Sequence, residues 1–492
     1  MAVSDCIKPP IALRRSFGWP VQYSLKKPNS IFIYPYGISD LRSRLFLALH
    51  KAMVCRWLES ESAPAVFIAL YLLNRIFTGR VNVASPSAIE HCLISERAQW
   101  VCTMNKRPLY FDYAATTPVD ARVIQVMVDC LGFEGNFGNP ASGSHVFGQQ
   151  ARLAVELARG QVAQLINAKP EQIIWTSGAT ESNNLALKGV AHACGQSHGH
   201  IITSQIEHKA VLDTARFLEQ SGFEVTYLAP DAQGLISADQ VSRALREDTL
   251  LVSLMLVNNE LGTVNDISGI GQRVREHGAL FHVDAAQGAG KVAIDLNECA
   301  VDLMSFSGHK VYGPKGIGAL YVGSRAHDRL QTQIHGGGHE SGLRSGTLAT
   351  HQIAGMGAAF ALAKDSFDEE LTAVSGLRQR LLEQLATVPG LQCNGSPTQR
   401  IPHTLSLTFA EGRFDSAALN DVLAYSATSA CNSASKAPSH VLLALGHDAQ
   451  TAGRTIRLSL GRFTREQDVD IAAQAIKDAL SVPAPFWAVA QA

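Results

Sequence analysis

The first residue that could do chemistry is a lysine in an unusual setting. Lys310 lies in SFSGHKVYGPKG (305–316), at the end of the apolar run VDLMSF (301–306). A lysine partly removed from water can have a lowered pKa and form a Schiff base with an aldehyde. Taken alone, a neighbouring histidine and lysine are more typical of an ordinary loop, so the rest of the chain must decide.

Two other segments would complement such a lysine. SGATES (177–182) is a strand-to-helix loop whose backbone N–H groups could bind an anion, although an ordinary helix cap gives the same pattern. Asp284, at the end of FHVDAAQ (281–287), could keep a pyridinium nitrogen protonated, or could only cap a strand. A phosphate site, a pyridinium partner and a Schiff-base lysine together indicate a site for pyridoxal 5′-phosphate (PLP).

The elements that must position these residues alternate between strands and helices. Helical spacing of apolar residues is clear at 144–166 and 180–193, and the intervening runs are apolar throughout. Such runs predict a mainly parallel sheet covered on both faces, which binds ligands at the carboxyl ends of its strands. The expected strands are 172–177, 200–204, 223–229, 250–257, 279–286, 301–306 and 318–323. The polar segments expected at their ends are 177–184, 206–209, 258–260, 284–287 and 307–310.

Composition excludes several classes of protein. The net charge of the 492-residue chain is −1, so no nucleic-acid partner is indicated. The nine cysteines are scattered without a CxxC pair, which favours free thiols in a reducing compartment, the cytoplasm. The longest apolar run of the first hundred residues, 65–73, is too short to span a membrane.

Residues 1–103 differ from the rest of the chain. They hold twelve Lys and Arg against six Asp and Glu and show no sustained helical or strand periodicity. A cleaved targeting peptide, an extra small domain and an upstream translation all fit this extension, and organellar targeting stays open. We favour a mis-assigned start, because MNKRPLYFDYAATTPVD from Met104 leads directly into an ordered segment.

Several longer motifs carry a family resemblance. From about Met104 to Arg465 the chain closely resembles the cysteine desulfurases, in particular the housekeeping iron–sulfur assembly type with a long catalytic loop. The resemblance implies a class V aminotransferase-like enzyme of the α/β, PLP-dependent fold type I, which works as a homodimer. The motifs are YFDYAATTPVD, FGNPASGSH, TSGATESNNLALKG, EHKAVLDT, VNNELGTV, HVDAAQ, SFSGHKVYGPKGIGALYV, HGGGHESGLRSGT and SACNSAS.

The resemblance and the change of pattern near residue 366 suggest a division into domains. Residues 120–366 would form the large PLP-binding domain. Residues 367–492 would form the small C-terminal domain, which carries the catalytic cysteine loop. Residues 104–119 would be the N-terminal segment of that small domain.

The resemblance also assigns roles around the cofactor ring. Lys310 would hold PLP as a Schiff base and later shuttle protons. Asp284 would pair with the pyridine nitrogen, and Gln287 would lie near the ring hydroxyl. His208 would stack on the ring and act in acid–base transfer, and Asn259 would approach the cofactor or the substrate.

The phosphate and the substrate carboxylate would be bound by other segments. The phosphate would be held by Ala179 and Thr180, by Ser307 and His309, and by the partner's Thr347. Arg457, in TIRLSLGR, would grip the substrate carboxylate with two parallel bonds. The alternative for Arg457 is a surface salt bridge, which its apolar surroundings disfavour.

Cys431 would be the sulfur acceptor. It lies in YSATSACNSASKAPS (425–439), a run of small polar residues with few apolar anchors. Its thiolate would attack the sulfur of bound cysteine and become a persulfide, which could also ligate an iron–sulfur cluster transiently. Ala427, Thr428 and Asn432 replace residues common in the family, which leaves the mobility of the loop open.

The predicted function is therefore conversion of L-cysteine to L-alanine, with sulfur delivered for iron–sulfur cluster assembly and tRNA thiolation. The predicted partners are a scaffold protein and other sulfur acceptors, without direct contact to nucleic acid or membrane. The alternatives are a selenocysteine lyase, another PLP-dependent lyase or aminotransferase, and a non-catalytic assembly platform. Intact Lys310, His208 and Cys431 argue against the platform.

Overall fold

The computed structural model describes residues 23–27, 30–33, 107–195, 198–410, 414, 416–426 and 437–481. The chain divides into two compact units, Met1–Arg107 and Pro108–Ala492. In the first unit, strands β1 (Tyr23–Lys27) and β2 (Ser30–Ile33) form an antiparallel pair. The predictions made for the remainder of residues 1–103 lie outside the described residues.

A seven-stranded sheet forms the centre of the second unit, in the order β4-β10-β9-β8-β7-β5-β6. Strands β9, β8, β7, β5 and β6 run parallel, and β10 is antiparallel to both of its neighbours. This confirms the predicted α/β fold with a mainly parallel sheet. The strands are β4 (Ile173–Thr176), β5 (His200–Ser204), β6 (Glu224–Leu228), β7 (Thr249–Met255), β8 (Leu280–Asp284), β9 (Leu303–Ser307) and β10 (Gly318–Val322).

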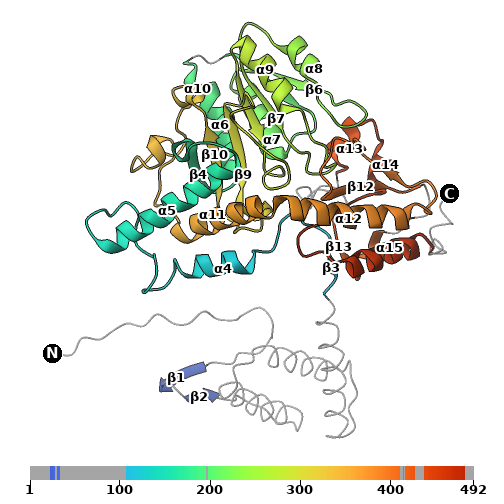
Figure 1. Ribbon diagram of the computed structural model, residues 1–492, viewed down its shortest axis with the longest axis horizontal. Helices are drawn as coiled ribbons and strands as arrows, with labels where there is room; N and C mark the ends of the chain where they lie inside the picture. Colours follow the sequence, from blue (N-terminus) through green and yellow to red (C-terminus); the bar gives the residue numbers. More distant parts are fainter. Residues whose placement is uncertain are drawn as a thin grey trace. The chain divides into compact units, whose positions relative to one another are not determined.

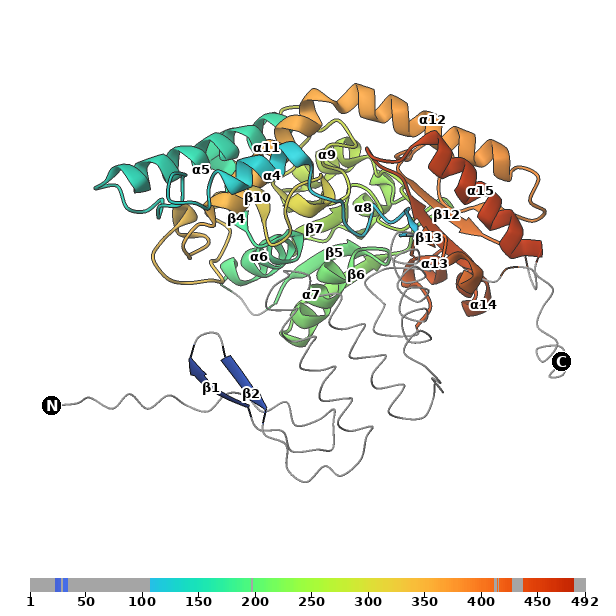
Figure 2. The ribbon, with the colours of Figure 1, turned by 90° about the horizontal axis from the view of Figure 1, so that it is seen from below.

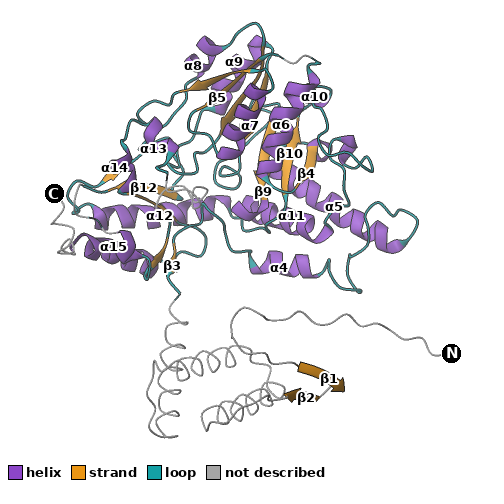
Figure 3. Ribbon diagram, turned by 180° about the vertical axis from the view of Figure 1, so that it is seen from behind, coloured by secondary structure: helices purple, strands orange, loops and turns teal. Residues whose placement is uncertain are grey.

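Helices cover both faces of this sheet (Figure 2). One face carries α5 (Val146–Leu165), α9 (Ile267–His277) and α11 (Thr350–Asp365). The opposite face carries α6 (Ala179–Ala193) and α7 (Lys209–Gln220), which lie in front of the strands when seen from behind (Figure 3). The shorter helices are α4 (Ala121–Val128), α8 (Ala238–Ala244), α10 (Ser324–His327), η1 (Pro170–Gln172), η2 (Gly308–Lys310) and η3 (Glu340–Gly342). Within the described ranges, no helix is long and apolar enough to cross a membrane.

The continuous apolar character of the strands follows from this double cover. Successive side chains of a strand point to opposite faces. Leu303 of β9 therefore packs with the α6 and α7 side, whereas Met304 and Phe306 pack with the α5, α9 and α11 side. Since both faces are dry, no alternation of apolar and polar residues is expected.

A second, smaller core lies toward the C-terminal end of the chain (Figure 1). It is built on an antiparallel sheet of β11 (Gln392–Cys393), β12 (Thr404–Thr408) and β14 (Thr455–Ser459). An early segment joins it, because β3 (Leu109–Tyr110) pairs with β13 (Leu423–Ala424) and Phe111 is buried in this core. The helices of this core are α12 (Phe367–Leu385), α15 (Glu466–Ser481) and η4 (Ser416–Leu419). Two short helices, α13 (His440–Ala444) and α14 (Ala449–Gly453), form a separate small cluster with Ile206 and Leu261.

Candidate functional site

The polar segments predicted at the strand ends share one edge of the large sheet. Asp284 is the last residue of β8, and Ser307 is the last residue of the adjacent parallel strand β9. Gly318, the first residue of antiparallel β10, pairs with both Ser307 and Thr176, the last residue of β4. The loop before α6 therefore starts at the same edge as the segment that carries Lys310.

Lys310 is half-buried. Its Nζ donates a hydrogen bond of 2.8 Å to the carbonyl oxygen of Ala114. Gln287 donates from Nε2 to the same oxygen over 2.7 Å, so the lysine and the amide lie side by side. The sequence reasoning missed Lys291, whose Nζ donates to Oε1 of Gln287 and whose pKa is lowered to about 7 by burial.

Asp284 is held by a partner that the sequence reasoning did not single out. Asn183 of α6 donates from Nδ2 to Oδ2 of Asp284 over 2.8 Å, and the amide of Ala286 donates to Oδ1. Asp284 is buried, and the Oδ1 atom of Asn183 has no hydrogen-bond partner among the described residues. The signal that could have found Asn183 is its place in the motif SGATESNN, on the first helix after the anion loop.

The predicted anion loop has the geometry of a helix N-terminus. Gly178 caps α6 with φ of 154°, a conformation that glycine adopts readily, and Ala179 and Thr180 form the first turn. The loop approaches β10 closely, since a Cβ atom at Gly318 would lie 2.6 Å from Cα of Gly178. Only a glycine at position 318 allows this approach, so the free backbone amides of the first turn stay beside the end of β10.

Two other residues predicted to bind the phosphate, Ser307 and His309, lie at the same edge. Thr347 is not expected at this edge, because it is predicted to act from the partner subunit. Ser307 is buried at the end of β9, and His309 follows it. Nδ1 of His309 is 3.1 Å from Oγ1 of Thr116, and burial, with Lys310 nearby, lowers the pKa of His309 to about 4. The imidazole is therefore neutral at pH 7. Thr347 is exposed on the segment before α11, and its role in a second subunit stays a prediction.

His208 is the N-cap residue of α7 and follows a fully buried carboxyl group. Its Nδ1 accepts from the amide of Ala210 over 3.1 Å, so the proton of the neutral ring is on Nε2. Glu207 accepts from Ser204 and from the amide of Met255, both at Oε1. Burial raises the pKa of Glu207 to about 8, so this carboxyl group is mostly protonated at neutral pH.

Arg457 lies on β14 and is only 4% exposed, so the guanidinium side of the ion pair that it forms is buried. Its Nη2 donates to Oδ1 of Asp112 over 2.7 Å and to Oγ of Ser426 over 2.9 Å. Its Nη1 donates to the carbonyl oxygen of Asn259 over 3.0 Å, which brings two predicted residues together. Asp112 and Ser426 were not predicted, although Asp112 belongs to the motif YFDYAATTPVD.

Cys431 lies outside the described residues, as do Ala427, Thr428 and Asn432. The described residues on either side of this segment contact the site. Ser426 forms two backbone hydrogen bonds with Arg457. His440, on the other side, is hydrogen-bonded through Nε2 to the carbonyl oxygen of Glu207. In the part of the chain that the structure describes, no group of His, Cys, Asp and Glu residues could hold a metal ion.

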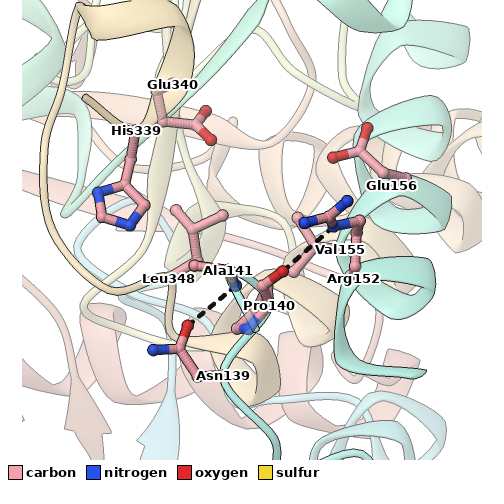
Figure 4. A pocket seen from close by; sticks show the side chains of 9 residues that line it. All are labelled: Asn139, Pro140, Ala141, Arg152, Val155, Glu156, His339, Glu340 and Leu348. Carbon is pink, nitrogen blue, oxygen red and sulfur yellow. Dashed lines mark hydrogen bonds between the residues drawn. The ribbon is translucent and has the colours of Figure 1, made fainter. Parts of the chain in front are cut away.

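A cavity of about 330 Å³ lies apart from these residues (Figure 4). It is crossed by hydrogen bonds from Arg152 to the carbonyl of Pro140 and from the amide of Ala141 to Asn139. Its walls are Asn139, Pro140, Ala141, Arg152, Val155, Glu156, His339, Glu340 and Leu348. None of the predicted site residues lines this cavity. The candidate site is therefore described by the residues at the strand ends and not by this cavity.

The fold and the strand-end site define the class of protein. The family model for aminotransferase class V matches residues 109–471. Two solved structures are similar over most of the chain. A "NIFS-LIKE PROTEIN" has a TM-score of 0.70 and 36% identity, covering 76% of this chain and 100% of that one. "SspA in complex with cysteine" has a TM-score of 0.65 and 43% identity, covering 72% and 99%.

Curated relatives narrow the class further. A protein named cysteine desulfurase IscS from Azotobacter vinelandii (strain DJ / ATCC BAA-1303) is 59% identical over 387 residues, 78% of this chain and 96% of the relative. A protein of the same name from Pseudomonas aeruginosa (strain LESB58) is also 59% identical with the same coverage. The chain belongs to the cysteine desulfurase family.

Proposed function

We propose that this protein is a PLP-dependent cysteine desulfurase that converts L-cysteine to L-alanine and holds the sulfur as a persulfide on Cys431. The observation that carries the proposal is the placement of Lys310 and Asp284 at the ends of adjacent strands, with the buried guanidinium of Arg457 joined to Asn259. The same chemistry at selenium would make a selenocysteine lyase, which is the nearest alternative.

The described residues fit PLP. Asp284 is a buried carboxylate whose two oxygens are fixed by hydrogen bonds, as a partner for a pyridine nitrogen should be. The first turn of α6, with Thr180, Ser307 and neutral His309, offers uncharged donors suited to a phosphate group. Lys310 and Gln287 converge on one carbonyl, which places an amine next to an amide donor for a ring hydroxyl. When bound, PLP would act as an electron sink for the substrate.

Two residues of the chain would move protons. Lys310 would take the proton from Cα of the substrate at Nζ, where its amine is already aimed by the Ala114 carbonyl. His208 would give and take protons at Nε2, because its Nδ1 is engaged by the amide of Ala210. The helix α7 therefore sets both the orientation and the tautomer of this imidazole.

Arg457 would bind the substrate carboxylate, and Cys431 would receive the sulfur. The thiolate of Cys431 attacks the substrate sulfur, a sulfur–sulfur bond forms, and the bond between sulfur and Cβ breaks. The electron pair of that bond stays on the carbon, which takes up a proton as alanine forms. The persulfide then passes its outer sulfur to an acceptor, for cluster assembly or tRNA thiolation. It could also ligate an iron–sulfur cluster transiently.

We also propose that the protein is a homodimer that hands sulfur to a scaffold protein and other acceptors. Three phenylalanines near the start of α5 support a contact surface, with exposures of 74% for Phe133, 44% for Phe137 and 38% for Phe147. Their rings lie 5.4 to 5.9 Å apart in one cluster, which costs free energy while it faces water. A cytoplasmic location stays a prediction.

The test is product analysis on the full chain supplied with PLP. With L-cysteine and a thiol reductant, L-alanine and sulfide should form in equal amounts. An aminotransferase would instead release a keto acid and need a second keto acid to continue. A parallel assay with L-selenocysteine tests the selenocysteine lyase alternative. A desulfurase should form a persulfide on the protein from L-cysteine. Absence of alanine from L-cysteine would overturn the proposal.

A further inference from the structure

We propose that Asp112 competes with the substrate carboxylate for Arg457, and that it thereby sets the affinity of the site for amino acids. This inference rests on the proposed function, because it assumes that Arg457 binds the carboxylate of the substrate. Asp112 is a positioning residue in this scheme. It acts through the guanidinium and does not touch the reacting atoms.

The contact between the two side chains is short and largely shielded from water. Nη2 of Arg457 lies 2.7 Å from Oδ1 of Asp112, and the exposures of the two side chains are 4% and 18%. Ser426 connects them further, because its hydroxyl donates to Oδ1 of Asp112 over 2.8 Å and accepts from Nη2 of Arg457. Asp112 therefore neutralises the guanidinium with a charge-assisted hydrogen bond.

The pairing occupies the atom that a substrate needs. A guanidinium can donate two parallel bonds along either of two edges, Nε with Nη2 or Nη1 with Nη2, so both edges require Nη2. The two protons of Nη2 are directed to Asp112 and Ser426. Nε is buried and has no hydrogen-bond partner among the described residues, so its N–H can donate to a bound carboxylate. A substrate carboxylate can complete a two-bond grip only by displacing one of these acceptors.

The displacement requires only a side-chain movement. The backbone of Asp112 is fixed by its pairing with Ser459, and its carbonyl accepts from the amides of Ala115 and Thr116. The Arg457 backbone is fixed within β14. A ligand with a carboxylate can exchange with Asp112, whereas an amine that lacks one leaves the Asp112–Arg457 pair intact. Arg457 therefore favours amino acids over simple amines, and its pairing with Asp112 reduces this preference by weakening the binding of amino acids alone.

The experiment compares two ligands that differ only in the carboxylate, L-alanine and ethylamine. Asp112→Asn keeps an acceptor oxygen for Nη2 and removes the competing charge. Isothermal titration of the PLP-loaded full chain should show L-alanine binding about tenfold more tightly to the variant, the value expected for one charge-assisted contact. Ethylamine affinity should change less than about twofold on the same scale. KM for L-cysteine should fall while kcat does not rise.

Two further variants complete the test. Asp328→Asn removes the same charge from a side chain that is 96% exposed, and it should leave L-alanine affinity unchanged. Ser426→Ala removes the hydroxyl shared by the pair, so it should also tighten L-alanine binding. This variant replaces Asp112→Asn in the test if Asp112→Asn does not fold. Unchanged or weaker L-alanine binding in both site variants would overturn the competition. If L-alanine binding tightened while wild type made no alanine from L-cysteine, the proposed function would fail and the role of Asp112 would stand.

Discussion

Lys310 and Ala114 are 196 positions apart in the chain, and Nζ of Lys310 donates a 2.8 Å hydrogen bond to the carbonyl oxygen of Ala114. The segment that starts the second unit therefore reaches across to the end of β9. Gln287, at the end of the adjacent strand, donates to the same oxygen. One backbone carbonyl thus fixes both the amine and the amide that are expected beside the cofactor.

Replacing Lys310 tests the first of these positions. Lys310→Ala removes the amine, so the enzyme should lose both the visible absorbance of lysine-bound PLP and its turnover of L-cysteine. Lys315→Ala, at an exposed lysine on the following turn, is the matched control and should behave like wild type. A Lys310→Ala protein in which borohydride still fixed PLP to another lysine would contradict the assignment.

The buried Glu207 predicts a dependence of stability on pH. Its pKa rises from 4.5 to about 8 on folding because the carboxyl group is buried. The folded protein therefore keeps a proton that the unfolded chain loses between pH 4.5 and about 8, so stability falls as pH rises through this window. Glu207→Gln lacks this slope. Its free energy of unfolding relative to wild type should rise by roughly 1 kcal/mol per pH unit.

Chemical denaturation at a series of pH values from about 5 to about 8 measures this difference. Glu276→Gln on α9, whose wild-type side chain is 53% exposed, should keep the wild-type slope. A constant difference between wild type and Glu207→Gln across the series would mean that Glu207 is ionised in the folded protein.

The strand ends were the most predictable part of the site. A run that is apolar throughout is a reliable sign of a strand buried on both faces, and the polar residues after it mark the ligand edge. Such a run carries no direction, however, so the antiparallel course of β10 was not predicted. It matters for the site, because it brings Gly318 beside the anion loop.

The supporting residues were less predictable because their roles depend on distant contacts. Asp112 and Arg457 are 345 positions apart, and no local pattern around either of them indicates an ion pair. Asn183 lies on α6, and the helical spacing of that segment gives no sign of its contact with Asp284. The pairing of β3 with β13 is similar, since each strand has only two residues and neither has a periodicity to recognise.

The division of the chain predicts that the N-terminal extension is dispensable. A protein that begins at Met104 keeps the whole of the second unit, which starts at Pro108. It should fold, bind PLP and turn over L-cysteine at about the wild-type rate, since every described site residue lies after Arg107. Size-exclusion chromatography and the alanine assay check this. Aggregation or loss of PLP in the shortened chain alone would mean that residues 1–103 are part of the fold.

The central claim is that sulfur passes to Cys431, and Cys431→Ser tests it most directly. PLP binding and recognition of the substrate depend on residues of the described site, so the variant should fold, bind PLP and still change its cofactor spectrum when L-cysteine is added. A hydroxyl group is a far poorer nucleophile toward sulfur than a thiolate, so alanine and sulfide formation should fall by at least about a thousandfold. Cys393→Ser, at an exposed thiol on β11, and Cys299→Ser should retain near wild-type rates. Near-normal desulfuration by Cys431→Ser would contradict the account and favour a lyase that releases sulfur directly.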